Sequence, residues 1–279
     1  MGGAVATVAQ VFEDRKMSMG RVFERAFATI THNPLVTLGL AFLFGGAPSL
    51  LSTYLTNMVR ADVTRKSVEA TGSFSRFGYE MIGVTLFSWA LGILIAALTQ
   101  AVLTRATTAE SDGRKAGFGE CIAAAFRVVF PLAALMILLV LAVMLGLVLL
   151  IVPGVILYVM WSVASPALVE EHSGVFGSFR RSQELTKGAR WKVFGLLLVV
   201  LVTAWILEAA AGFAAIALVG LDGMRTIATG QLPIAYTIVM LVISTLTNVF
   251  WGTVQASTYV ELRQWKEGGS SEQLAEVFA

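Results

Sequence analysis

The sequence predicts an all-α, polytopic membrane protein of about six transmembrane helices, arranged as three hairpins that are each preceded by an amphipathic interfacial helix. Hydrophobic residues make up 57% of the 279-residue chain and charged residues only 14%, with a mean hydropathy of +0.78. A soluble domain typically carries about 25% charged residues, so this composition indicates that lipid is the natural solvent. Long apolar runs recur along the chain, and basic residues gather between alternate runs.

The apolar runs have the length of membrane helices, which need about 20 mostly apolar residues. Helices are expected because an isolated strand cannot satisfy its backbone in lipid, and a β-barrel would show alternating segments of about ten residues. The expected spans are Pro34–Leu55, Met81–Leu103, Phe130–Val152, Gly154–Val169, Val193–Val219 and Pro233–Val260.

Glycine and proline mark two expected interruptions of these spans. In the first span, Gly45, Gly46 and Pro48 predict a kinked or broken helix. Between the third and fourth spans, Pro153 and Gly154 predict the turn, because proline lacks an amide donor and glycine tolerates unusual dihedral angles.

The placement of lysine and arginine predicts that both termini are cytoplasmic. With six spans, 15 of the 20 Lys and Arg residues fall on the side of the termini, as the positive-inside rule requires. One membrane region over 34–260 then separates a cytoplasmic amphipathic segment (about 1–33) from a cytoplasmic tail (261–279). Thr56 to Glu80 is expected as a short exposed connection outside. The first strongly apolar run begins only near Leu35, so we expect an anchor and no signal peptide.

Three segments that precede pairs of spans share an amphipathic pattern. Met19–Ile30 and Phe118–Val129 carry apolar residues at helical spacing with charges elsewhere on the wheel, whereas Arg180 and Arg181 interrupt the stripe of Val175–Leu185. Each fits a helix in the headgroup layer that feeds a transmembrane hairpin, so three repeated units are expected. The alternative is that cytoplasmic loops near a membrane tend to be amphipathic and basic without any repeat.

The stretch from Gly177 to Phe194 carries the most distinctive motifs of the chain. They are Arg180-Arg181-Ser182, Leu185-Thr186-Lys187-Gly188 and Trp191. Over roughly residues 116–200 the chain resembles the membrane domain found with some bacterial glycerophosphoryl diester phosphodiesterases. This resemblance implies a multi-helix protein of the bacterial inner membrane. It does not imply phosphodiesterase activity, because a separate soluble barrel performs that chemistry in the family and no segment here is left to form one.

A basic cluster beside a tryptophan is the first candidate site, for contact with anionic lipid headgroups. At the cytoplasmic interface each cation near anionic lipid is worth about 1 kcal/mol, and tryptophan suits an interfacial anchor. The alternative is that these cations only fix the topology. The cluster comprises Arg180, Arg181, Lys187, Arg190, Lys192 and Trp191.

Glu208 is the second candidate site, because it lies near the middle of the fifth expected span. A carboxylate at that depth costs several kcal/mol unless it is neutralised, paired or wetted, so it indicates a proton site or a polar cavity. The alternative is a structural glutamate that is hydrogen-bonded to Asn248 or Gln255 of the last span.

Several kinds of chemistry lack support in the sequence. His32 and His172 do not fall in a spacing that presents several metal ligands on one face, so no metal or cofactor is expected. Cys121 is the single cysteine and has apolar neighbours, which indicates a buried small residue and excludes an intrachain disulfide. A net charge of only +2 leaves no dense basic stripe for nucleic acid.

These observations bear on three classes of function. The basic cluster, the amphipathic segments and the resemblance favour a non-catalytic protein for lipid handling or membrane organisation, with membrane lipids, an envelope protein or a second copy as partner. Glu208 and the repeated hairpins favour instead a small transporter or transporter subunit with a polar site around Glu208. A lipid-modifying enzyme is disfavoured, because no cluster of acid, base or metal ligands is visible.

Overall fold

The computed structural model describes residues 17–69, 74–228 and 233–278, and every regular element in this part of the chain is a helix. The predicted all-α class is therefore confirmed. Six helical stretches are long and apolar enough to cross a membrane, by length and composition, in agreement with the predicted number. They are Pro34–Lys66, Gly78–Ser111, Phe118–Leu149, Ile151–Glu171, Arg190–Gly220 and Ile234–Gly268.

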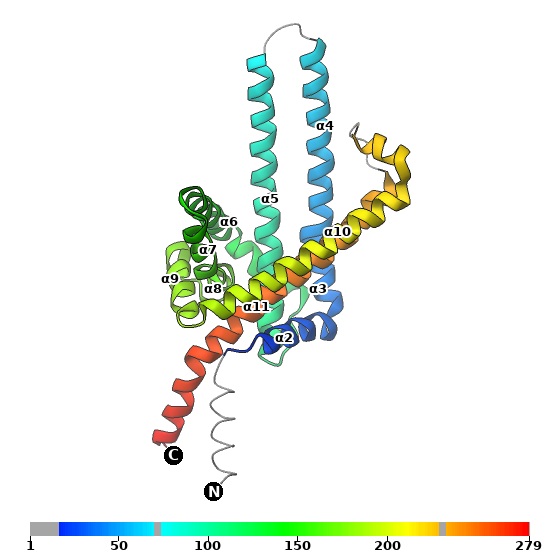
Figure 1. Cartoon of the computed structure of the whole chain (residues 1–279). Helices are drawn as coiled ribbons and strands as arrows, with labels where there is room; N and C mark the ends of the chain where they lie inside the picture. Colours follow the sequence, from blue (N-terminus) through cyan, green and yellow to red (C-terminus); the bar gives the residue numbers. More distant parts are fainter. Residues whose placement is uncertain (1–16, 70–73, 229–232, 279) are drawn as a thin grey trace.

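The helices form a packed lower body from which one hairpin rises. The start of the described chain and the last residues of α11 lie at the same end of the molecule (Figure 1). The helices α4 and α5 extend side by side towards the opposite end. α10 and α11 lie against each other and run obliquely to that hairpin. The elements are α2 (Met19–His32), α3 (Pro34–Ala41), the π-helix η1 (Phe42–Gly46), α4 (Ala47–Glu69), α5 (Phe74–Ser111), α6 (Phe118–Leu149), α7 (Ile151–Met160), α8 (Ala164–Glu171), α9 (Gly174–Thr186), α10 (Arg190–Ala228) and α11 (Ile234–Phe278).

Apolar side chains fill the interior of the lower body and also cover much of its outside. Leu103 of α5, Leu132 of α6 and Leu168 of α8 are fully buried in one core cluster. On the outer faces, Phe130 of α6 and Phe213 of α10 are exposed. Large exposed apolar patches are costly in water, so this surface is suited to lipid.

The interruption predicted in the first span is present as the π-helix η1. Its two glycines lie where α5 and α11 approach closely. A Cβ on Gly45 would stand 3.0 Å from Thr99 Oγ1, and one on Gly46 would clash with Thr245 Oγ1. The glycines are therefore needed for packing as well as for the irregular turn.

The turn predicted at Pro153 and Gly154 is wrong by three residues. The chain reverses at Leu150, which is extended (φ −162°, ψ 142°), and Pro153 and Gly154 lie in the first turn of α7. Proline is favoured there because a first-turn amide has no helical partner. Gly154 packs against α6, where a Cβ would stand 2.7 Å from Leu147 N.

The expected short connection from Thr56 to Glu80 is also wrong, because α4 continues to Glu69 and α5 begins at Phe74. Asp62 pairs with Arg65 (3.0 Å) and with Lys66 (2.5 Å) at helical spacing, which stabilises an exposed helix. The hairpin thus projects as two helices.

Two of the three expected amphipathic segments are separate helices, α2 and α9. The segment Phe118–Val129 is not separate, because it forms the first turns of α6 and nothing breaks the helix before the apolar run. The expected tail from residue 261 onward likewise continues α11, and Glu261 and Leu262 are buried in the body. The residues of the expected N-terminal segment before Met17 lie outside the described residues.

Candidate functional site at a broken helix

The fourth expected span is not one helix. Residues 161–163 leave the helical path between α7 and α8, with Trp161 at φ −107°, ψ 11° and Val163 at φ −108°, ψ 15°. A break of this kind leaves backbone amides and carbonyls without helical partners. In a stretch that is apolar enough for a bilayer, these groups must be satisfied from elsewhere in the protein.

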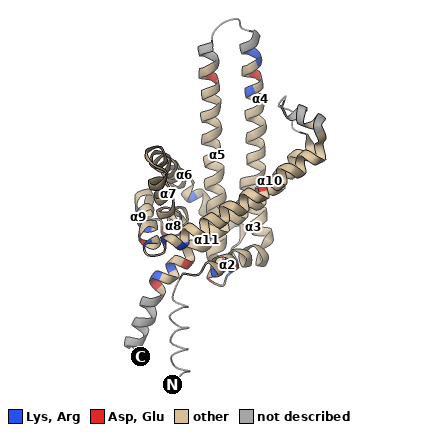
Figure 2. Ribbon diagram, in the orientation of Figure 1, with Lys and Arg blue, Asp and Glu red and all other residues tan. Residues whose placement is uncertain are grey.

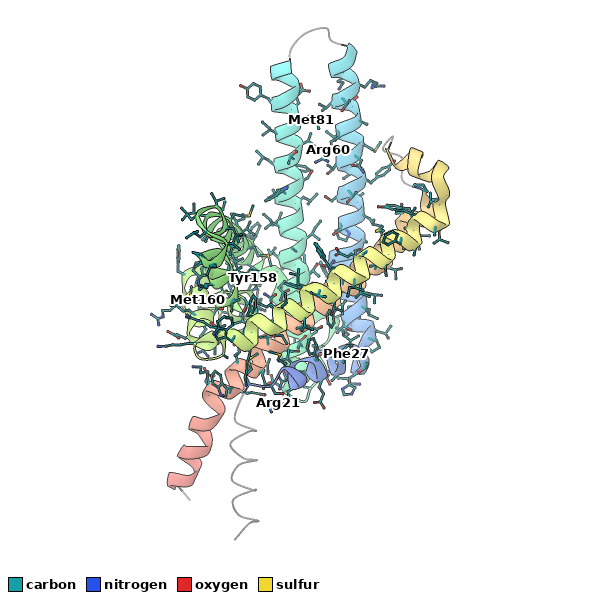
Figure 3. All side chains as sticks on the ribbon, in the orientation of Figure 1. Arg21, Phe27, Arg60, Met81, Tyr158 and Met160 are labelled. Atoms are coloured by element: carbon teal, nitrogen blue, oxygen red, sulfur yellow. The ribbon has the colours of Figure 1, made fainter. Side chains whose placement is uncertain are left out.

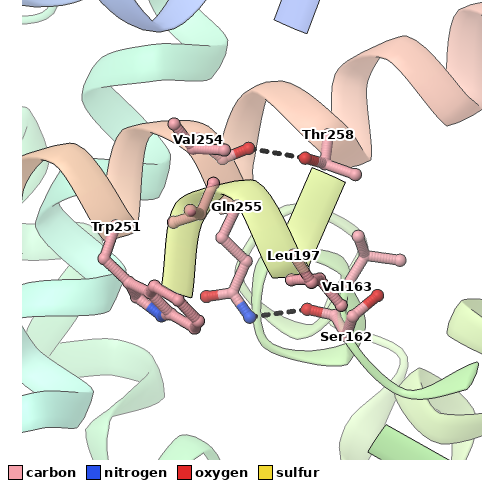
Figure 4. Close-up of a pocket in the computed structure, with 8 residues that line it drawn as sticks. Ser162, Val163, Leu197, Trp251, Val254, Gln255 and Thr258 are labelled. Carbon is pink, nitrogen blue, oxygen red and sulfur yellow. Dashed lines mark hydrogen bonds between the residues drawn. The ribbon is translucent and has the colours of Figure 1, made fainter. Parts of the chain in front are cut away.

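Side chains of α9 and α11 supply the missing hydrogen bonds. Ser182 Oγ donates to Met160 O (2.9 Å) and accepts from Val163 N (3.3 Å). Gln255 Nε2 of α11 donates to Ser162 O at 2.5 Å (Figure 4). The break is therefore held in place by tertiary hydrogen bonds, and it fixes the position of Gln255.

A cleft of about 610 Å³ lies beside the break. This volume falls within the range of roughly 300–1,000 Å³ that is typical of ligand sites. Trp89 and Ile93 of α5, with Leu139 and Val140 of α6, form apolar walls. The side chain of Trp89 is 60% exposed and that of Val140 is 40% exposed, so the cleft opens to the side of the molecule.

Uncharged polar side chains line the rest of the cleft. They belong to the three helices α5, α8 and α11 and to the break itself, and they are Ser88, Thr99, Gln100, Ser162, Ser165, Asn248 and Gln255. A Cβ on Gly252 of α11 would stand 3.5 Å from Gln100 Oε1, so α5 and α11 bring Gln100 close to the stretch that carries Gln255. The cleft thus offers hydroxyl and amide groups next to aromatic and aliphatic walls.

A second, much smaller cavity of about 10 Å³ shares Ser162, Trp251 and Gln255 with the cleft (Figure 4). Its volume is about that needed by one water molecule. Val163 of the break and Leu197 of α10 line its other sides. Gln255 therefore stands between this small cavity and the cleft.

The structure brings together two of the three residues of the predicted polar site. Asn248 and Gln255 both line the cleft, but Glu208 does not. Glu208 lies on the exposed face of α10 and makes no hydrogen bond or ion pair within the part of the chain that the structure describes. The suggested partner Gln255 is bonded to the break instead.

The predicted basic cluster is divided by its ion pairs. Arg181 lies between Glu171 (2.8 Å) and Glu267. Burial disfavours its charged form, but the hydrogen bonds to Glu267 and Glu171 outweigh this and raise the pKa of Arg181. Arg180 pairs with Glu184 at 3.3 Å on the exposed face of α9. Arg181 thus acts as a link between helices, whereas Arg180 keeps an outward position.

The other members of the cluster lie around the start of α10. Trp191 is 86% exposed, and Lys187 is exposed too. Lys192 Nζ donates to Met17 O at 2.9 Å, and Arg190 is half-buried. Charged side chains gather at this end of the molecule and near the tip of the α4–α5 hairpin (Figure 2). Lys187 and Trp191 are therefore the members best placed to contact a headgroup layer.

Sequence reasoning missed the break and with it the cleft. A usable signal was Pro166, since proline is tolerated in the first turn of a helix but not in its interior, so a helix must begin shortly before it. α8 begins at Ala164, two residues earlier. In the described residues, no group of three His, Cys, Asp or Glu side chains comes together as metal ligands.

These features define a class: a helical protein with six stretches suited to crossing a membrane and a side-opening cleft at a helix break. The chain belongs to the family described as "Domain of unknown function (DUF7847)", which matches residues 17–262. Met17 and Leu262 are both buried, so the match begins and ends within the packed body. No curated protein and no solved structure was found to match. The resemblance to the phosphodiesterase-associated membrane domain stays a prediction.

Proposed function

We propose that the protein is a non-catalytic, multi-pass protein of the bacterial inner membrane that handles lipids by holding one amphipathic lipid in the cleft. The observation that carries this proposal is the cleft itself, which joins apolar walls to polar groups at a helix break. Such a surface matches a molecule with an apolar chain and a polar end.

The distribution of side chains supports insertion into a bilayer. Exposed aromatic and aliphatic residues such as Phe130 and Trp205 cover the helices, and charged residues gather at the two ends of the molecule (Figure 2). Arg21 on α2 and Arg60 on α4 lie towards opposite ends (Figure 3). We place the end that carries α2 and α9 in the cytoplasm, together with both termini, because it holds most of the basic residues.

The basic residues near α10 support a second, looser contact with lipid. Lys187 and Trp191 face outwards at the proposed cytoplasmic interface, where cations attract anionic headgroups and tryptophan is favoured. This contact orients the protein in its membrane. It is distinct from the cleft, which lies among the proposed spans.

A transport role is the second candidate, and the broken fourth span favours it. Discontinuous helices in membrane transporters expose backbone groups at the substrate site. In this chain the break would serve a substrate in the cleft, and Glu208 would not contact it. An envelope protein or a second copy of the chain would complete such an assembly.

Photo-crosslinking from two neighbouring positions tests the lipid site. A benzophenone amino acid is placed at Val140, which lines the cleft, or at Leu141, which is 60% exposed but does not line it. Membranes are solubilised, washed with detergent to remove loosely held lipid, irradiated and analysed by mass spectrometry. We expect a lipid adduct at Val140 and none at Leu141. Equal labelling at both positions, or no lipid at Val140, would refute the proposed site.

A further inference from the structure

The cleft contains no formal charge among its described lining residues. Its polar groups are hydroxyls, primary amides, the indole N–H groups of Trp89 and Trp251, and the phenol of Tyr158 on α7. A phosphate group carries a negative charge that water or cations must stabilise. In an apolar layer an anion without such partners is strongly disfavoured.

Arg105 is the cation next to the cleft, and two ion pairs already neutralise its charge. Arg105 follows Gln100 by five residues on α5, about 7.5 Å along the helix axis. It lies 2.7 Å from Glu120 and 3.1 Å from Glu170. With two carboxylates as partners, Arg105 has no net positive charge to offer to a phosphate in the cleft.

The side chains of the cleft that have no hydrogen-bond partner among the described residues suit a hydroxyl group of a ligand. The side chains of Ser165, Asn248 and Tyr158 make no hydrogen bond with any described residue, although all three residues line the cleft. Hydroxyls and amides both donate and accept, whereas a phosphate only accepts. A ligand hydroxyl, which also does both, can satisfy these groups without bringing charge.

We infer that the cleft selects an uncharged lipid whose polar end carries hydroxyl groups, such as a diacylglycerol or a polyprenol, over an anionic phospholipid. This inference rests on the proposed lipid site. The hydroxyl end lies against Ser165, Asn248 and Gln255. The chain lies along the apolar side of α5 from Ala96 towards Trp89, on the side of the cleft away from the charged layer at Arg105.

Competition at the crosslinking position tests the selectivity. The full chain with benzophenone at Val140 is delipidated in detergent and titrated with dioleoylglycerol or with phosphatidylglycerol. We expect dioleoylglycerol to label the cleft at concentrations at least tenfold lower than phosphatidylglycerol does. Equal or better labelling by phosphatidylglycerol overturns the inference but leaves the lipid site standing. Labelling by neither lipid counts against the proposed function itself.

Two substitutions at Asn248 sharpen the test, because this residue is exposed at the edge of the cleft and tolerates change better than the buried Gln100. Asn248→Leu removes one hydrogen-bonding group and should weaken dioleoylglycerol labelling about fivefold. Asn248→Lys adds a cation and should raise phosphatidylglycerol labelling at least tenfold. If Asn248→Lys leaves the order of the two lipids unchanged, charge does not set the selectivity and the inference is wrong.

Ser244 supplies the matched control on the same helix. It lies one turn from Asn248, donates to Leu241 O (3.1 Å) within α11, and does not line the cleft. Ser244→Leu should therefore leave both titrations unchanged. A change as large as that of Asn248→Leu would show that the effect comes from α11 packing and would overturn the assignment of Asn248 to the site.

Discussion

Arg21 Nη2 lies 2.6 Å from Glu261 Oε1, in an ion pair that joins α2 to α11 across 240 residues of sequence. The side chain of Glu261 is only 3% exposed, and it also faces Arg25 at 3.5 Å. Its carboxylate accepts a hydrogen bond from Ser18 N at 3.0 Å. Burial lowers the pKa of Arg25, although Glu261 opposes this shift. The carboxylate of Glu261 therefore links α2, the first described helix, to α11, the last one.

Replacing Glu261 by leucine should destabilise the fold by about 3 kcal/mol, because removing one partner of a buried ion pair leaves the other uncompensated. Thermal unfolding of the full chain in detergent measures the loss. Glu184→Leu is the matched control, since the Arg180–Glu184 pair is 83% and 55% exposed. Exposed pairs contribute less than about 1 kcal/mol. Equal losses in the two variants would mean that the α2–α11 pair is not a structural link.

The α6–α7 hairpin depends on a glycine. Gly154→Ala places a Cβ 2.7 Å from a backbone nitrogen that cannot move freely, so we expect a loss of about 1–3 kcal/mol. Gly83→Ala on α5 meets nothing within 4 Å and should be neutral or stabilising by up to about 1 kcal/mol. Chemical unfolding of both variants compares them. Similar stabilities would argue against the close α6–α7 contact.

The broken fourth helix depends on a buried serine. Ser182→Ala removes the partner of Val163 N and one of two donors to Met160 O, which keeps Thr186 Oγ1 at 3.3 Å. Leaving the Val163 amide unpaired should cost about 1–3 kcal/mol. Ser178→Ala is the control, because that serine is equally buried on α9 but bonds to Gly174 O within its own helix (2.7 Å). Its loss should be smaller, and hydrogen exchange at residues 161–163 should rise only in Ser182→Ala. An unchanged exchange rate at residues 161–163 in Ser182→Ala would contradict the role of Ser182 in stabilising the break.

The sequence predicts well those features that depend on local composition. The six apolar runs and the irregular first span follow from residue types that are close together, such as Gly45 and Gly46. The break at 161–163 could not be placed in this way. It is held by Ser182 and by Gln255, and Gln255 lies 93 residues from its partner Ser162, so its geometry depends on tertiary packing.

The candidate site shows the same limit. Asn248 and Gln255 stand out in the sequence as polar residues in an apolar run, and both line the cleft. Glu208 stands out for the same reason but lies outside it. A helix that is apolar on all sides gives no periodic signal for its rotation. The face on which Glu208 lies is therefore set by how α10 packs on α11, which local sequence does not reveal.

The proposed topology predicts the labelling of introduced cysteines. Cys121 is fully buried and should resist a membrane-impermeant maleimide in the native protein. Its replacement by alanine gives a background for Arg60→Cys on α4 and Lys187→Cys at the proposed cytoplasmic interface, both at exposed positions. On intact cells we expect labelling at position 60 alone, and at 187 only after lysis. Labelling of both positions on intact cells would rule out this topology.

Glu208→Gln separates lipid binding in the cleft from a transport role that depends on this carboxylate. Glu208 is exposed on α10 and lines no part of the cleft, so the amide should leave lipid crosslinking at Val140 unchanged. Because Glu208 has no partner in the described chain, stability should change by less than about 0.5 kcal/mol, or rise as a charge leaves the apolar layer. A proton-coupled transporter would instead lose activity on this substitution while keeping its fold. Reduced crosslinking at Val140 in a stable Glu208→Gln protein would show that α10 and the cleft are coupled. That result would contradict the structure, in which Glu208 lies outside the cleft.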